Sequence, residues 1–158
     1  MIKIICVGKI KEKYLKDAIS EYEKRLTKYE KVKIIEVNDI NSYDKDIILS
    51  KEKDEILRYV DERDFVITLE INGNMLNSEE LALKINNIYN TNSTITFIIG
   101  GSYGIDEKVS ERSNYKLSFS KLTFPHQLFR VILLEQIYRA FKINNNEAYH
   151  KWWPYFIV

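Results

Sequence analysis

The sequence predicts an α/β protein with a mostly parallel sheet and helices on both faces. Runs rich in Ile and Val alternate along the chain with stretches whose apolar residues recur at helical spacing. This alternation is typical of an open parallel sheet. The 158 residues include only 5 Gly and 2 Pro, which favours a single domain without long linkers.

The first part of the chain supplies three expected strands and two helices. Ile2–Val7 is an almost unbroken β-branched run, as expected for a strand that is covered on both faces. Residues 13–28 combine apolar residues at helical spacing with Lys and Glu, which indicates an amphipathic helix. The turn signal Asn72-Gly73-Asn74 is expected to end the third strand. The remaining elements of this part are expected as strand 32–37, helix 44–60 and strand 64–70.

The second part of the chain continues the alternation. Asn77 followed by Glu80 resembles a capping box, in which two side chains satisfy the first backbone N–H groups of a helix. The expected elements are helix 78–90, strand 94–99, the short helix 106–113, strand 115–119 and a final helix 125–142.

Composition excludes several classes of protein. No apolar run is long enough to span a bilayer, and residues 1–8 are expected to form a strand and not a signal peptide. Cys6 is the one cysteine and lies inside the first strand, so a buried structural thiol is expected. The absence of a Cys/His cluster argues against zinc and fits a cytoplasmic protein.

Charge is unevenly distributed although the net charge is only +1. Residues 1–108 hold 17 Lys and Arg against 20 Asp and Glu, whereas residues 109–158 hold 7 against 3. A basic C-terminal part suggests an anionic ligand there, and chance asymmetry is an equally good explanation of the charge pattern alone.

A glycine-rich turn, Gly100-Gly101-Ser102-Tyr103-Gly104, connects an expected strand to an expected helix. Backbone N–H groups can approach a ligand closely in such a turn. The turn is neither G-x-G-x-x-G nor a P-loop, so common nucleotide-binding motifs are excluded. A cofactor loop and a simple tight connection remain equally good interpretations. Ligands of parallel sheets lie beyond the carboxyl ends of the strands, which gives three candidate edges: Leu69-Glu70, Ile99-Gly100 and Phe119-Ser120.

The final helix is apolar in nearly every direction, so we expect one face on the sheet and the other on a second subunit. Glu135 and Arg139 are spaced i and i+4, a pair whose default interpretation is structural. His126 is expected to hydrogen-bond within the first helical turn, and a histidine so near the chain end as His150 is usually solvated.

Four segments of the chain, taken together, resemble the RlmH family. This family comprises the bacterial pseudouridine N3-methyltransferases of large-subunit (23S) rRNA and belongs to the trefoil-knotted SPOUT superfamily. The resemblance covers residues 1–151 and leaves residues 152–158 as an atypical aromatic extension. It rests on Val7-Gly-Lys-Ile-Lys-Glu-Lys-Tyr14, Ile99-Gly-Gly-Ser-Tyr-Gly104, Leu117-Ser-Phe-Ser-Lys-Leu-Thr-Phe-Pro-His-Gln127 and Glu135-Gln-Ile-Tyr-Arg-Ala140.

The resemblance implies a C-terminal trefoil knot, a homodimer and a site for S-adenosyl-L-methionine (SAM). It further implies that Arg139, Tyr149 and His150 lie at the methyl-transfer site, with no metal required. Carried over by motif, the SAM contacts fall on Leu69, Gly100, Phe119, Ser120, Lys121, Leu122, Thr123 and Phe124.

These residue types suit the implied chemistry. The N3 of pseudouridine is a weakly acidic imide, so Arg139 would stabilise its developing negative charge and His150 could accept its proton. The near-neutral net charge suggests weak binding to naked RNA, so we expect the assembled ribosome to be the substrate. The alternatives are a methyltransferase for another RNA such as tRNA, or a non-catalytic ribosome-associated binding module.

Overall fold

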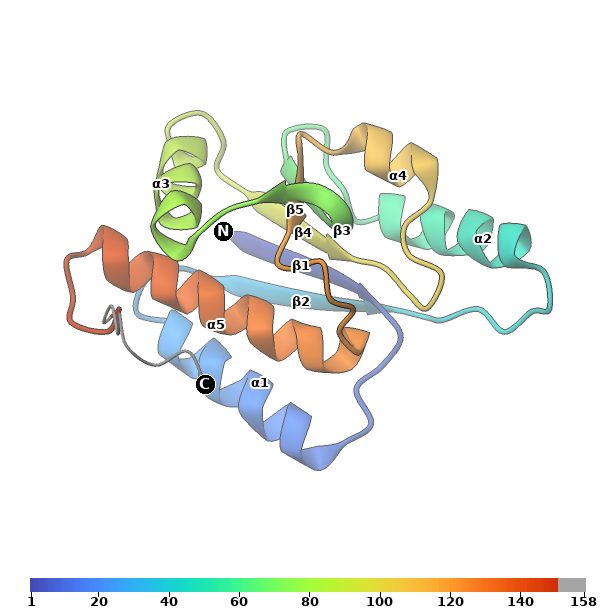
Figure 1. The fold of residues 1–158 in the computed structure, drawn as a ribbon, viewed down its shortest axis with the longest axis horizontal. Helices are drawn as coiled ribbons and strands as arrows, with labels where there is room; N and C mark the ends of the chain where they lie inside the picture. The colour runs from blue at the N-terminus through green and yellow to red at the C-terminus, as the bar shows by residue number, and fades with distance from the viewer. Residues whose placement is uncertain (151–158) are drawn as a thin grey trace.

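The computed structural model describes residues 1–150, which form a five-stranded, fully parallel sheet with the strand order β2-β1-β4-β3-β5 (Figure 1). The α/β class with helices on both faces is therefore confirmed. In chain order the elements are β1 (Ile2–Val7), α1 (Lys13–Leu26), β2 (Val32–Val37), α2 (Lys45–Leu57), β3 (Phe65–Met75), α3 (Ser78–Tyr89), β4 (Ile95–Ile99), α4 (Glu107–Arg112), β5 (Tyr115–Ser118) and α5 (His126–Asn144).

The helices divide between the two faces of the sheet. Helices α1, α3 and α5 pack on one face, and α2 and α4 cover the other (Figure 1). Side chains alternate along each strand, so β1 sends Ile4 and Cys6 into the larger core and Ile5 and Val7 into the smaller one. Cys6 is 0% exposed, as expected for a structural thiol.

The helix starts follow the local sequence. Asp44 accepts the backbone N–H of Asp46 at 2.9 Å and so caps α2. At α3 the expected capping box is present, because Asn77 accepts from the Glu80 N–H and Glu80 accepts from the Asn77 N–H, each at 2.8 Å.

One expectation about the strands was wrong. The Asn72-Gly73-Asn74 segment is not a terminating turn, because β3 continues through it to Met75. The pairing with β5 shifts register between Leu69 and Asn74, which makes a bulge. Gly73 is needed there, since a Cβ would lie 2.8 Å from the backbone of Leu117. Past the bulge, β3 pairs with β5 again at Asn74 and Met75.

Helix α5 departs from the expected all-apolar pattern at one position. Its buried residues include Arg130, which is 1% exposed. The outer side is open, because Leu128 is 41% exposed. The trefoil knot and the boundary at residue 151 stay predictions, and the extension 152–158 lies outside the described residues.

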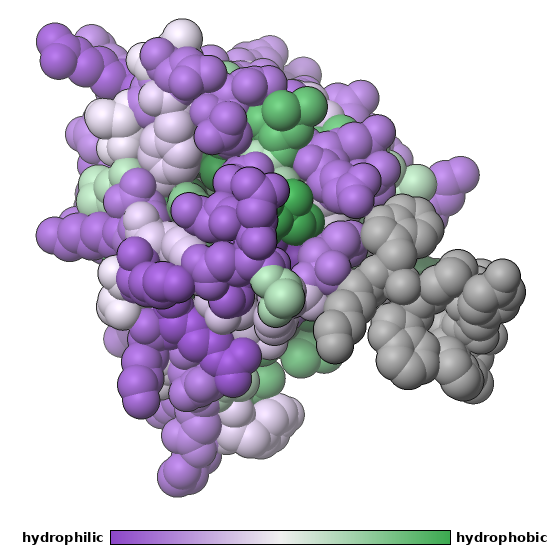
Figure 2. Space-filling view, turned by 90° about the vertical axis from the view of Figure 1, so that its left-hand side faces the viewer, coloured by the Kyte–Doolittle hydropathy of each residue, from purple (hydrophilic) through white to green (hydrophobic). Residues whose placement is uncertain are grey.

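The molecular face toward α3 and the end of α5 is mostly hydrophilic, with small separate hydrophobic patches (Figure 2). Within residues 1–150, no helix is long and apolar enough to cross a membrane. Over the same residues, no group of three or more His, Cys, Asp or Glu side chains is placed to hold a metal ion.

Candidate functional site

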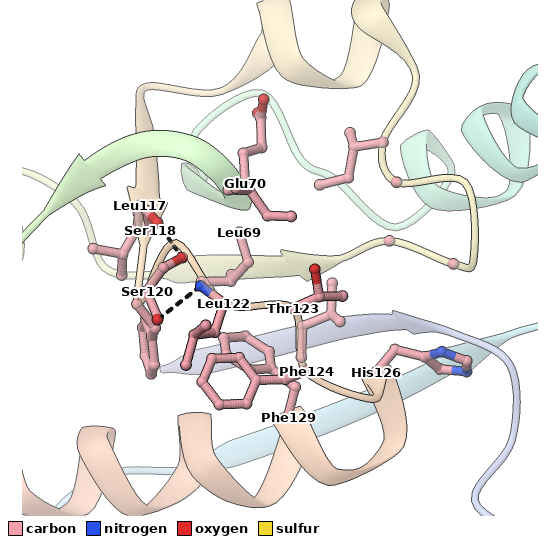
Figure 3. Close-up of a pocket in the computed structure, with 17 residues that line it drawn as sticks. Leu69, Glu70, Leu117, Ser118, Ser120, Leu122, Thr123, Phe124, His126 and Phe129 are labelled. Carbon is pink, nitrogen blue, oxygen red and sulfur yellow. Dashed lines mark hydrogen bonds between the residues drawn. The ribbon is translucent and has the colours of Figure 1, made fainter.

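The bulge of β3 after Leu69 and the carboxyl ends of β4 and β5 meet at a cavity of about 160 Å³, here called the strand-end pocket (Figure 3). These are the three edges expected from the sequence. Phe119 and Phe124 each contact Phe129 of α5, with ring centroids 4.9 and 5.7 Å apart. The apolar side chains around the cavity are Leu69, Ile99, Leu117, Phe119, Phe124 and Phe129.

The glycine turn forms one wall of this pocket and is built too closely for side chains. A Cβ on Gly100 would lie 2.3 Å from the carbonyl oxygen of Gly104, well inside van der Waals contact. The Gly104 N–H donates to the Gly101 carbonyl at 3.1 Å, and Gly104 has a φ of +86°. The turn therefore presents bare backbone to the pocket.

The loop after β5 forms a second wall and is held by short-range hydrogen bonds. The Ser118 hydroxyl donates to the Ser120 carbonyl at 3.1 Å, and the Leu122 N–H donates to the Ser120 hydroxyl oxygen at 2.9 Å (Figure 3). These bonds fold the loop back over the end of β5 and bring Thr123 and Phe124 to the pocket.

Seven of the eight residues assigned to the cofactor by motif line this pocket. They are Leu69, Gly100, Phe119, Ser120, Leu122, Thr123 and Phe124. Lys121, the eighth, is exposed and is not among the lining residues.

A carboxylate that the sequence assignment missed also lines the pocket. Glu70 accepts hydrogen bonds from the Thr68 hydroxyl at 2.7 Å and from the Ser110 hydroxyl of α4 at 2.8 Å. The Glu70 side chain extends away from the phenylalanine cluster (Figure 3). Glu70 could have been found from its position after Leu69 at the end of the expected strand 64–70, which is one of the three candidate edges.

Arg130 anchors the start of α5 to the end of β1. Its guanidinium pairs with Glu36 at 2.7 Å and donates to the carbonyls of Val7 and Gly8 at 2.8 and 2.6 Å. Burial and the nearby Arg130 charge lower the pKa of His126, which lines the strand-end pocket. The anchor fixes the helix against which the pocket loop packs.

The three residues assigned to methyl transfer lie together around Glu135, beside the pocket. Arg139 donates to both oxygens of Glu135, through Nη2 and, at 3.4 Å, through Nε. The Tyr149 hydroxyl donates to Glu135 at 3.2 Å, and Arg139 Nη1 lies 3.3 Å from His150 Nδ1. Glu135 therefore organises the group, which is here called the Glu135 cluster. From the sequence, Glu135 was expected only to form a structural pair with Arg139, without a contact to Tyr149.

A second cavity of about 520 Å³, the α3–α5 pocket, adjoins this cluster. It is lined by His150, Gln136 and Ser78, and the Ser78 hydroxyl donates to the Gln136 side chain at 2.9 Å. Phe119 and Phe124 line both cavities, so the two pockets are neighbours across these rings.

Known proteins resemble this chain over nearly its whole length. Proteins named ribosomal RNA large subunit methyltransferase H from Clostridium novyi (strain NT) and Clostridium botulinum (strain Alaska E43 / Type E3) are 57% and 56% identical over 157 residues. Each alignment covers 95% of this chain and 99% of the relative. A solved structure of a probable methylase family protein from Haemophilus influenzae Rd KW20 has the same fold. It has a TM-score of 0.55 and 16% identity, over 97% of this chain and 71% of that one. The family model described as "Predicted SPOUT methyltransferase" matches residues 1–150, and the chain therefore belongs to the SPOUT methyltransferase family.

Proposed function

We propose that this enzyme transfers a methyl group from SAM to N3 of a pseudouridine in 23S rRNA. The observation that carries the proposal is the strand-end pocket, whose walls include two of the four segments on which the resemblance to RlmH rests, Ile99–Gly104 and Leu117–Gln127. Relatives at 57% identity over nearly the full length are named for methylation of large-subunit rRNA, which supports the substrate.

The lining of the strand-end pocket suits SAM by its chemistry. A flat purine is accommodated by apolar walls such as Leu69, Leu117 and Phe124, and the bare backbone at Gly100 permits close approach. The fixed Glu70 carboxylate offers an acceptor for hydroxyl or ammonium groups. When bound, SAM supplies an electrophilic methyl group on a positively charged sulfur.

Arg139 is the residue that we propose stabilises the negative charge on the target base. A fixed positive group at a developing anion contributes most when it needs no reorganisation, and Glu135 holds this guanidinium through two of its nitrogens. Tyr149 packs under it, with the guanidinium carbon 4.9 Å from the ring centroid.

We propose a homodimer that uses the outer side of α5. Leu128 and the loop residues Leu122 and Phe124 are exposed beside the strand-end pocket, where a second copy would cover them. The proposed substrate is the assembled ribosome in the cytoplasm, because a net charge of +1 gives little electrostatic attraction to naked RNA.

Titration calorimetry with SAM tests the cofactor, and the Arg139→Ala variant tests the site. We expect wild-type protein to bind SAM and Arg139→Ala to lose turnover while it keeps nearly the wild-type affinity for SAM. Arg25→Ala, an exposed arginine of α1, serves as the matched control. No binding at high micromolar SAM would favour a non-catalytic module, and methylation of tRNA but not ribosomes would favour the other RNA substrate.

A further inference from the structure

We infer that His150 is held as the neutral tautomer with its proton on Nε2, and that it donates a hydrogen bond to the target base. This deepens the proposed function and rests on it. It replaces the expectation from the sequence that His150 accepts the N3 proton.

The tautomer follows from the contact between Arg139 and His150. Arg139 Nη1 lies 3.3 Å from His150 Nδ1. A guanidinium has only N–H donors and stays protonated in proteins, so Nδ1 must offer its lone pair. A neutral imidazole that accepts at Nδ1 carries its one proton on Nε2.

Glu135 keeps Arg139 in place for this role. It binds the guanidinium at Nη2 and Nε, so Arg139 presents Nη1 to His150. The same carboxylate accepts from the Tyr149 hydroxyl at 3.2 Å and from the Gln136 amide at 2.6 Å. Its oxygens are therefore already engaged by three donors.

The other members of the Glu135 cluster are no better as proton acceptors. Burial and the neighbouring Glu135 carboxylate raise the pKa of Tyr149 to about 12, so its hydroxyl stays protonated at neutral pH. The titratable groups around His150 are Arg139, Glu135 and Tyr149, together with Glu79 across the α3–α5 pocket. Apart from the Glu135 carboxylate, the members of the cluster are thus donors.

The α3–α5 pocket is where His150 would meet the base, because His150 is the member of the Glu135 cluster that lines it. His150 lines this pocket with Gln136, and Phe119 and Phe124 separate it from the strand-end pocket. Two carbonyl oxygens flank N3 of a uracil-type ring, so a donor at either one stabilises the imide anion. The N3–H bond breaks and its proton goes to water. N3 then forms the N–C bond, and the electron pair of the breaking C–S bond stays on sulfur.

Nuclear magnetic resonance of the ¹⁵N-histidine-labelled full-length protein tests the tautomer without any turnover. The chain has two histidines, and the signals that vanish in His150→Gln belong to His150. We expect a pyrrole-type shift for Nε2 and a pyridine-type shift for Nδ1 of His150, with a mixture of tautomers in Arg139→Ala. A proton on Nδ1 in the wild-type protein would overturn the inference.

Substitutions test the donor role. The amide nitrogen of Gln lies about as far from the backbone as Nε2, whereas that of Asn reaches only as far as Nδ1. We expect His150→Ala and His150→Asn to lose about 10²–10³-fold in kcat, the cost of one lost donor to a developing anion, and His150→Gln to restore most of that loss. If all three variants lose activity equally but keep the wild-type affinity for SAM, the donor role is refuted and the proposed function is not. A wild-type protein that binds no SAM would instead refute the proposed function.

Discussion

Replacing Arg130 by Met removes the anchor between α5 and β1 while keeping an unbranched side chain that reaches as far as the Arg130 Nε. The change removes the ion-pair partner of Glu36, which keeps its hydrogen bond from the Ile10 N–H at 3.0 Å. It also removes the Arg130 donor to the carbonyls of Val7 and Gly8. Removing one member of a buried ion pair costs about 3–5 kcal/mol, and a buried acceptor left unpaired costs about 1–3 kcal/mol. The two free-energy costs are not added, because both describe the loss of the same guanidinium.

Two features place the expected cost at the low end of that range. The Glu36 side chain is 33% exposed, so water can solvate the freed carboxylate. Arg130 Nε is buried and lacks a hydrogen-bond partner among the described residues, so the wild-type arrangement already carries an unmet donor. We therefore expect a loss of about 3 kcal/mol in the free energy of unfolding.

Urea unfolding at fixed protein concentration, followed by circular dichroism, measures this loss. For a chain of this size the same change lowers the thermal midpoint by about 6–12 °C. Arg25→Met, which breaks an exposed pair with Glu21, is the control and should leave the midpoint nearly unchanged. A loss below about 1 kcal/mol for Arg130→Met would mean that the buried guanidinium does not anchor α5.

Three further predictions concern the pocket, the thiol and the acid response. Gly100→Ala should weaken SAM binding about tenfold or more in calorimetry, because its Cβ would displace Gly104, whereas Ser102→Ala in the same turn should not. Equal affinities would remove the turn from the site. Cys6 should resist Ellman's reagent until the protein unfolds, since burial raises the pKa of its thiol to about 12; fast labelling of native protein would contradict this. Hydrogen bonds from Lys142, Lys28 and Tyr29 lower the pKa of Glu147 to about 2, so the stability that it contributes is present above the unfolded value of about 4.5 and is lost as pH falls toward 2. Thermal unfolding between pH 7 and pH 3 should show a steeper loss for wild type than for Glu147→Gln, and parallel curves would exclude the effect.

Local patterns predicted most of the fold. The strands and helices were recognisable because apolar spacing and caps such as Asn77 and Glu80 are set by neighbouring residues. The Asn72-Gly73-Asn74 error arose because Gly73 serves a contact with Leu117, 44 positions away in the chain, and a turn signal cannot reveal such a contact.

The site was predictable only in part, for the same reason. The rule that ligands of parallel sheets lie beyond the carboxyl ends of the strands located the pocket. It did not indicate Arg130, whose partner Glu36 lies 94 positions away in the chain. The grouping of Arg139, Tyr149 and His150 came from family resemblance. The i, i+4 spacing indicated the Glu135–Arg139 pair but gave no sign that Tyr149 would bind the same carboxylate. Glu70 stood at a predicted edge, yet its role depends on Ser110 from another helix.

Mass spectrometry of 23S rRNA after incubation with this protein tests the central claim most directly. Ribosomes from cells that lack the corresponding methyltransferase are incubated with the purified protein and isotope-labelled SAM, and the rRNA is digested to nucleosides. We expect one labelled methyl group on N3 of a pseudouridine, formed faster on ribosomes than on isolated rRNA and absent with Arg139→Ala. Unlabelled rRNA in the presence of SAM-bound wild-type protein would contradict it.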